Sequence, residues 1–235
     1  MAVRLPPGAV ISGQSAAEVW GVRLASVTDP VEVLTPVRMR SVPGSLIRVG
    51  SLDPAEMRVR GSVPVPTAMH TAWEIARRSP ILQAVARVDA LARVRGLDGN
   101  RLVAHGLEHA GQAGCVSALA ALRLVDRRAE SVPESIVRVS LILGGLPAPI
   151  PQYRIVIDQQ FLARVDLAYP EIRLALEYDG QWHADRDQLT RDRRRIRNLN
   201  AAGWYVYPIT RHDLRDLDGL VAAVRALVEK RSRRM

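Results

Sequence analysis

Residues 161–179, FLARVDLAYPEIRLALEYD, decide the fold that this sequence predicts. Both halves of the stretch alternate between apolar and other side chains, which is the period of a half-buried strand. The tripeptide Tyr169-Pro170-Glu171 separates the two halves and is typical of a turn. We therefore predict two antiparallel strands joined as a hairpin.

A helix and a further strand are predicted before this hairpin. Ser131 and Glu134 fit a capping box with Pro133 in the first turn, which predicts a helix ending at Gly144-Gly145. The run QYRIVI at residues 152–157 predicts the further strand.

A basic helix over about residues 185–202 is predicted after the hairpin, followed by the strand WYVYPI at residues 204–209 and a last helix with an apolar stripe. The order helix, three strands, helix, strand, helix indicates an α/β domain over residues 131–235.

Residues 1–130 show a different pattern, a β-segment followed by a helical layer. SAAEVW predicts a short helix, and VEVLTP and LIRVG predict short strands in a segment rich in proline. Thr67 is a predicted helix cap, and Ser79-Pro80 begins the next helix. Two more helices are predicted near residues 99–109 and 113–126. We expect a smaller α+β domain here, with a boundary near residue 130.

The composition is that of a globular protein with a basic surface. The 235 residues are 48% hydrophobic and 24% charged, the formal net charge is +9, and of the 33 basic residues only Lys230 is a lysine. An excess of arginine favours a polyanionic partner, because the planar guanidinium donates two parallel hydrogen bonds to phosphate. A GC-rich genome produces the same bias without any function, and both explanations stand at this stage.

Targeting and redox signals are absent from the sequence. No apolar run approaches the roughly 18–20 residues that span a bilayer, and MAVRLPPGAV at residues 1–10 lacks the apolar core of a signal peptide. The single cysteine, Cys115, excludes an internal disulfide and a cysteine-rich zinc site. We therefore expect a cytoplasmic protein without a membrane partner.

Acidic side chains gather where the two strands of the hairpin end. Asp166 belongs to the first strand and Glu177 to the second, and Asp179 follows on the same face as Glu177. Antiparallel pairing across a short turn places Asp166 opposite or diagonal to Glu177. Carboxylates this close repel each other unless a cation compensates them, and Mg²⁺ prefers such oxygen ligands together with substrate phosphate. Together with the arginine-rich helix, the pattern favours phosphodiester hydrolysis.

Two segments, VDLAYPEIRLALEYDGQWH at residues 165–183 and QLTRDRRRIRNLNAAGWYVYPIT at residues 188–210, resemble an uncharacterised actinobacterial family related to the very-short-patch-repair endonucleases. The resemblance implies a PD-(D/E)xK restriction-endonuclease-like fold over residues 131–235, with a mixed sheet flanked by helices. Residues 1–130 are more weakly similar to the core of abortive-infection type IV antitoxins.

The resemblance assigns roles to five residues. Asp166 and Glu177 match the acids that bind the metal, and Glu134 matches a helix glutamate near the active site. Asp179 falls where many members of the wider superfamily have lysine, and His183 matches a histidine that assists catalysis. The resemblance thus implies a DNA endonuclease of DNA repair or phage defence that uses Mg²⁺, with Mn²⁺ as a substitute.

Asp179 and Pro208 depart from the pattern, because the wider superfamily often has lysine at the first position and relatives commonly have a basic residue at the second. The sole lysine, Lys230, lies near the C-terminus and cannot replace the missing one. We expect His183 to act as the base, because a neutral imidazole accepts a proton near pH 7 whereas an arginine only stabilises charge.

Three arginines of the basic helix are expected to hold the DNA backbone. These are Arg191, Arg194 and Arg195. A solvated basic face explains the same residues, and Arg195 is also a candidate partner for Asp192, which 3-4 spacing directs inward.

Several alternatives remain open from the sequence. Asp179-Gly180 is also a common turn dipeptide, and Glu134 also fits a capping box alone. The missing lysine and Pro208 favour a catalytically inactive nuclease-fold protein, either a DNA-binding protein or an antitoxin-like transcriptional regulator. A small-molecule phosphodiesterase or a tRNA-end enzyme would have the same acids. A second copy of the chain and a toxin-like protein are further candidate partners.

Four other histidines receive no role: His70, His105, His109 and His212. His105 and His109 are four residues apart on a predicted helix, which is a metal-binding spacing. Glu108 between them does not match the order of the zinc proteases, so we treat the spacing as chance.

Overall fold

The computed structural model describes residues 6–24, 26, 28–40, 42–179 and 186–233, and within 186–192 it describes the backbone alone. The chain divides into two compact units, Met1–Arg127 (unit 1) and Arg128–Met235 (unit 2). Each unit is described by itself. The described residues form eight α-helices and three small sheets, so the chain is an α/β protein.

Unit 1 begins with short strands in two sheets. The first sheet has the order β1-β2-β3, in which β1 is antiparallel and β3 parallel to β2, and β4 and β5 form an antiparallel pair. Their bounds are β1 Val10–Ile11, β2 Val31–Thr35, β3 Ser45–Val49, β4 Met57–Arg60 and β5 Val63–Pro66. The helix α1 (Gly13–Val19) separates β1 from β2, and a 3-10 turn η1 (Pro54–Glu56) leads into β4.

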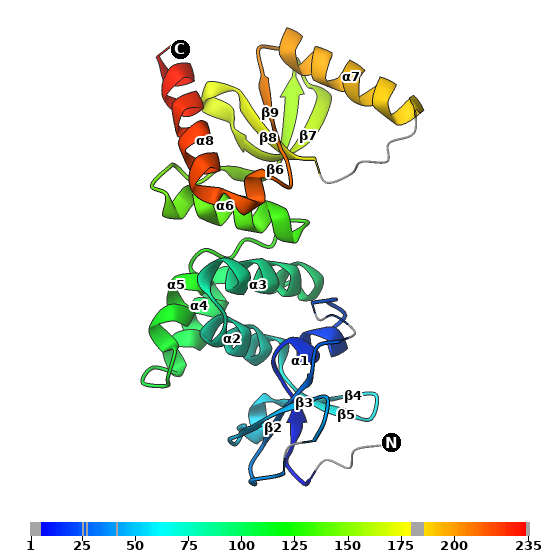
Figure 1. The fold of residues 1–235 in the computed structure, drawn as a ribbon, viewed down its shortest axis with the longest axis vertical. Coiled ribbons are helices and arrows are strands. Elements are labelled where there is room, and N and C mark those ends of the chain that lie inside the picture. The colour runs from blue at the N-terminus through cyan, green and yellow to red at the C-terminus, as the bar shows by residue number, and fades with distance from the viewer. Residues whose placement is uncertain (1–5, 25, 27, 41, 180–185, 234–235) are drawn as a thin grey trace. The chain divides into compact units, whose positions relative to one another are not determined.

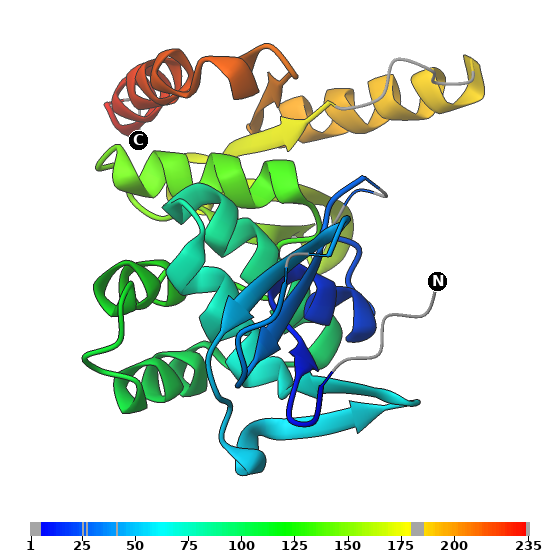
Figure 2. The same cartoon turned by 60° about the horizontal axis from the view of Figure 1, so that its bottom comes forward.

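Four helices complete unit 1 (Figure 2). They are α2 Ala68–Arg78, α3 Ile81–Arg95, α4 Gly99–Glu108 and α5 Cys115–Leu122. The Oγ1 of Thr67 accepts a hydrogen bond from the His70 amide at 3.1 Å, which confirms the predicted cap of α2. Trp73 is completely buried at the centre of this helical layer.

Unit 2 is built on a four-stranded mixed sheet of order β6-β7-β8-β9. β6 and β8 are antiparallel to β7, and β9 is parallel to β8. The strands are β6 Ile150–Ile157, β7 Gln160–Tyr169, β8 Leu174–Tyr178 and β9 Tyr205–Ile209. The β6–β7 turn is a two-residue hairpin in which Asp158 and Gln159 have positive φ, and the predicted β7–β8 hairpin is confirmed.

Helices cover both faces of this sheet (Figure 1). They are α6 Val132–Leu143, α7 Arg186–Ala201 and α8 Leu217–Ser232. One core joins α6 and α8 to the sheet through Val137, Leu141, Leu220 and Val224, and the other packs Leu199 of α7 on the opposite face. Apolar side chains therefore pack against both faces of the sheet, and the strands hold the side chains near their ends in defined positions.

The predicted N-cap of α6 is confirmed, since the Oγ of Ser131 accepts a hydrogen bond from the Glu134 amide at 3.3 Å. The second half of the predicted capping box differs, because the Glu134 carboxylate accepts from the Glu130 amide rather than from that of Ser131. None of the helices in the described part of the chain combines the length and the apolar character needed to cross a membrane.

Candidate functional site

Asp166 and Glu177 lie on adjacent strands of the unit 2 sheet. Leu167 pairs with Leu176, so the antiparallel register sets Asp166 across from Glu177 one step further along. The Oδ2 of Asp166 also accepts a hydrogen bond from the Tyr178 amide at 2.9 Å. The local prediction that these two acids are cross-strand neighbours is confirmed.

Glu134 adds a third carboxylate from the first turn of α6. Its residue is only 6% exposed, and its Oε2 accepts hydrogen bonds from the Glu130 amide at 3.0 Å and from the side-chain amide of Gln152 at 2.8 Å. Glu134 therefore does more than take part in the N-terminal cap of α6, because Gln152 of β6 binds its side chain and holds it next to the sheet.

Gln152 connects the two buried acids. It falls between the pairs Pro151–Leu167 and Tyr153–Val165, beside Asp166, and its side chain forms hydrogen bonds with both Asp166 and Glu134. Its φ of 53° is in the left-handed region, which costs a non-glycine residue about 1–3 kcal/mol. Sequence reasoning missed Gln152, because the alternation that predicts β6 carries no signal for a left-handed residue inside it.

The electrostatics of the site disfavour a bare negative charge on Asp166. Burial, and more weakly the carboxylates of Glu134 and Glu177, raise the pKa of Asp166 to about 6, against the opposing hydrogen bonds from Tyr178 and Gln152. A cation beside Asp166 would reverse this balance, because an opposite charge favours the ionised carboxyl.

Arg195 of α7 neutralises Glu177. Its two terminal nitrogens donate to the two carboxylate oxygens at 2.5 and 2.6 Å, and the side chains are 33% and 17% exposed. The bidentate geometry is the strongest form of this ion pair. We expected Arg195 to contact phosphate, but here its guanidinium faces the acidic site, since the helix packs this side chain toward β8.

The remaining predicted residues are less tightly held. Asp179 follows β8 and is exposed, and its amide donates to the carbonyl of Ile209 at 2.8 Å. Arg194 is exposed on α7 and is free to meet an external phosphate, whereas the side chain of Arg191 and all of His183 lie outside the described residues. Pro208 stands opposite Glu177 in the parallel β8–β9 pair.

The donor set of this site matches a hard cation. Asp166 and Glu177 offer carboxylate oxygens at one sheet end, with Glu134 close enough to influence the charge of Asp166, and Mg²⁺ prefers such oxygens. Glu177 becomes available to a metal only when Arg195 releases it. Among the described residues, the group of acids and histidines whose ligand atoms converge within 4.8 Å lies in unit 1 and does not include these acids.

Comparison with known proteins gives relatives of unknown activity. The chain is 36% identical over 200 residues to uncharacterized protein Rv2248 of Mycobacterium tuberculosis strain H37Rv, and equally to uncharacterized protein MT2308 of strain CDC 1551. In each case the match spans 83% of this chain and 72% of the relative. No family model matches the chain, and no solved structure matches it.

Proposed function

The chain belongs to the protein family of these two mycobacterial relatives, and we propose that it is a metal-dependent DNA endonuclease that hydrolyses phosphodiester bonds. The single observation that carries the proposal is the placement of Asp166 across from Glu177, with the buried Glu134 tied to the same point through Gln152. Arg195 compensates Glu177 alone, so ionising the partly buried Asp166 remains costly, and a Mg²⁺ ion bound for nuclease chemistry would compensate it.

The restriction-endonuclease-like fold belongs to the same proposal. The support for it is that unit 2 has a mixed sheet between helices, as the resemblance implies, with Asp166 within β7 and Glu177 near the end of β8. The very-short-patch-repair relationship and the antitoxin-like character of residues 1–130 rest on the sequence resemblance.

Each residue of the site has a distinct part. Asp166 and Glu177 would hold Mg²⁺, which polarises a phosphoryl oxygen and lowers the pKa of a bound water. Gln152 would orient the carboxyl of Asp166 through a hydrogen bond, and Glu134 would hold Gln152 in place by accepting a second one. His183 would accept a proton from the attacking water. Arg191 and Arg194 would bind DNA phosphates.

The Arg195–Glu177 ion pair favours a second candidate, an inactive nuclease-fold protein that binds DNA or acts as an antitoxin-like regulator. The guanidinium of Arg195 binds both carboxylate oxygens of Glu177, a proposed metal ligand, and so supplies the positive charge that a metal would otherwise provide. In that case the acids stabilise the fold, and the protein binds DNA through exposed arginines without cutting it.

A plasmid-nicking assay separates the two candidates. We expect the purified chain to convert supercoiled plasmid to open circles with Mg²⁺ or Mn²⁺, and Asp166→Asn to lose this activity by at least about 100-fold. The control is Asp158→Asn in the β6–β7 turn, which changes the same functional group away from the acids. Equal activity of the Asp166→Asn variant removes this site from the reaction. DNA binding without cleavage in either metal supports the inactive protein.

A further inference from the structure

Three imidazoles and one carboxylate converge in unit 1, whereas the acids discussed above belong to unit 2. Glu56, His70, His105 and His109 each offer one ligand atom, and these atoms all lie within 4.8 Å of one another. We propose that these four residues form a binding site for a divalent late transition metal ion, and that Zn²⁺ is the ion it prefers. The site does not depend on the proposed nuclease activity.

Separate elements bring the four residues together. Glu56 ends η1, His70 lies in the first turn of α2, and His105 and His109 lie one turn apart at the end of α4. The Thr67 amide donates to the Glu56 carbonyl at 2.7 Å, which joins the η1 segment to the start of α2.

The rings are held by packing as well. His109 stacks on Trp73 with ring centroids 5.4 Å apart, and the three histidine rings contact one another at centroid distances of 4.6–5.8 Å. The site is therefore formed before any ion arrives.

The polar atoms of this cluster face one another. The Nε2 atoms of His105 and His109 are 3.2 Å apart, a hydrogen bond whose direction depends on the tautomer, and the Nδ1 of His70 forms an ion-pair contact with the Oε2 of Glu56. Among the described residues, these last two atoms are buried and have no hydrogen-bond partner outside their own pair. The four ligand atoms are therefore directed at one another rather than at water.

The surroundings of the cluster suit a metal. His70 and His105 are each only 8% exposed, and burial favours the uncharged form of an imidazole. Neutral imidazoles keep the lone pair that binds a metal. A single cation between three neutral rings and a carboxylate would satisfy all four groups together.

The ligand types select the metal. Three nitrogens and one carboxylate oxygen are typical of zinc and its neighbours in the first transition row, whereas Mg²⁺ and Ca²⁺ require mainly oxygens. Four protein ligands complete a tetrahedral shell, which is the arrangement of structural zinc. We infer that the ion holds the β4–β5 hairpin against α2 and α4.

One outer contact and the access route bear on this assignment. The side-chain amide nitrogen of Gln112 is 3.1 Å from the Nδ1 of His109. Metal binding at Nε2 requires the amide of Gln112 to turn so that its oxygen accepts the Nδ1–H. A cavity of about 380 Å³, lined in part by Glu56, His70 and His109, gives an ion a route to the ligands.

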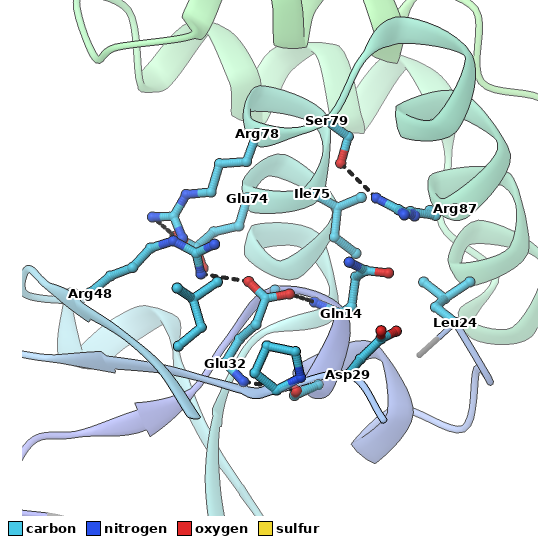
Figure 3. Close-up of a pocket in the computed structure, with 14 residues that line it drawn as sticks. Gln14, Leu24, Asp29, Glu32, Arg48, Glu74, Ile75, Arg78, Ser79 and Arg87 are labelled. Carbon is cyan, nitrogen blue, oxygen red and sulfur yellow. Dashed lines mark hydrogen bonds and ion pairs between the residues drawn. The ribbon is translucent and has the colours of Figure 1, made fainter. Parts of the chain in front are cut away.

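A second cavity of unit 1, about 310 Å³, makes a useful contrast (Figure 3). Its charges are paired within the protein, Arg48 with Glu32 at 2.5 Å and Arg78 with Glu74 at 2.9 Å. None of its described lining residues is a histidine, so it lacks the nitrogen donors that favour zinc.

Zinc titration of the metal-stripped full chain tests the proposal. We expect one zinc per chain, a higher melting temperature with zinc, and the intense visible spectrum of tetrahedral Co²⁺ when cobalt replaces zinc. His109→Ala is expected to lower zinc affinity by at least about tenfold, because ligands contribute no less than the outer-shell partners whose loss costs 10–100-fold. His109→Cys keeps a ligand and should retain the metal with an added sulfur-to-cobalt band.

Two controls keep the test decisive. His212→Ala changes a histidine outside the cluster and should bind zinc as the wild type does, and so should Asp166→Asn, which separates this site from the nuclease proposal. Wild-type protein that takes up no zinc overturns the proposal, and so does unchanged zinc affinity in folded His109→Ala. If His109→Ala does not fold, the stoichiometry and cobalt spectrum of the wild type decide.

Discussion

The guanidinium of Arg195 on α7 holds both carboxylate oxygens of Glu177 at the end of β8, at 2.5 and 2.6 Å. The two residues are 18 positions apart in the chain, so the ion pair ties the basic helix to the end of β8. The proposed metal would have to displace Arg195 from Glu177 in order to bind both oxygens of this carboxylate.

Removal of the arginine tests this exchange. Arg195→Ala leaves Glu177 partly buried without its bidentate partner, and we expect a loss of about 1–2 kcal/mol in the free energy of unfolding, less than for a fully buried pair because both groups touch solvent. Adding Mn²⁺ should recover part of the loss. Urea unfolding with and without Mn²⁺ measures both effects, and a loss that Mn²⁺ leaves untouched contradicts the exchange.

Asp166 predicts a pH-dependent difference in stability. The pKa of its carboxyl rises from 3.8 to about 6 on folding, mainly through burial, so the folded state binds the proton more tightly than the unfolded chain. Protonation of Asp166 therefore stabilises the folded state below pH 4, and this stabilisation is lost as the pH rises through 6. Asp166→Asn removes the ionisation, and we expect it to be about 1–2 kcal/mol more stable than the wild type at pH 8, after allowing for partial exposure.

Thermal unfolding of both proteins from pH 4 to pH 8 without divalent ions measures this difference. The advantage of Asp166→Asn should shrink toward pH 4. An advantage that stays constant over the whole range would show that ionisation of Asp166 is not its cause.

The side chain and the backbone of Gln152 are expected to make opposite contributions to the free energy of unfolding. Gln152→Ala loses the amide that donates to Glu134 but keeps the left-handed strain, so we expect it to destabilise unit 2 by about 1–3 kcal/mol. Gln152→Gly loses the same amide and relieves the strain, so it should be about 1 kcal/mol more stable than Gln152→Ala. Chemical denaturation of the two variants checks the order, and a more stable alanine variant contradicts the role of φ.

Arg194 predicts a change in the salt dependence of DNA binding. If it contacts one phosphate, Arg194→Ala should weaken binding uniformly across sequences and reduce the slope of log K against log salt by about 1. Lys230→Ala on α8 removes an equally exposed cation from another helix and serves as the control. Fluorescence anisotropy over a salt series measures the slope. Equal slopes for the two variants would exclude a specific role for Arg194.

Local signals predicted most of the secondary structure. The Ser131 cap, the alternation through residues 161–179 and the cap at Thr67 act over a few residues, and the corresponding elements are present in the structure. The β4–β5 hairpin was not predicted as such, because its prolines are typical of breaks in strands, yet here they occupy an isolated two-stranded pair.

Long-range partners could not be predicted from the sequence. The guanidinium of Arg195 reaches Glu177 on β8, a partner that spacing within one helix does not predict, and the side chain of Asp192, its other candidate partner, lies outside the described residues. Only the four-residue spacing of His105 and His109 pointed to the cluster in unit 1, because Glu56 and His70 come from other elements that tertiary structure brings in. The interpretation of that spacing as chance took account of α4 alone, which supplies only two of the four residues.

A crystal soaked in Mn²⁺ tests the central claim most directly. The account predicts an anomalous-scattering peak between the carboxylates of Asp166 and Glu177, with the guanidinium of Arg195 displaced from Glu177. A crystal in which Arg195 still holds both oxygens of Glu177, with no peak beside Asp166 at saturating Mn²⁺, would contradict it.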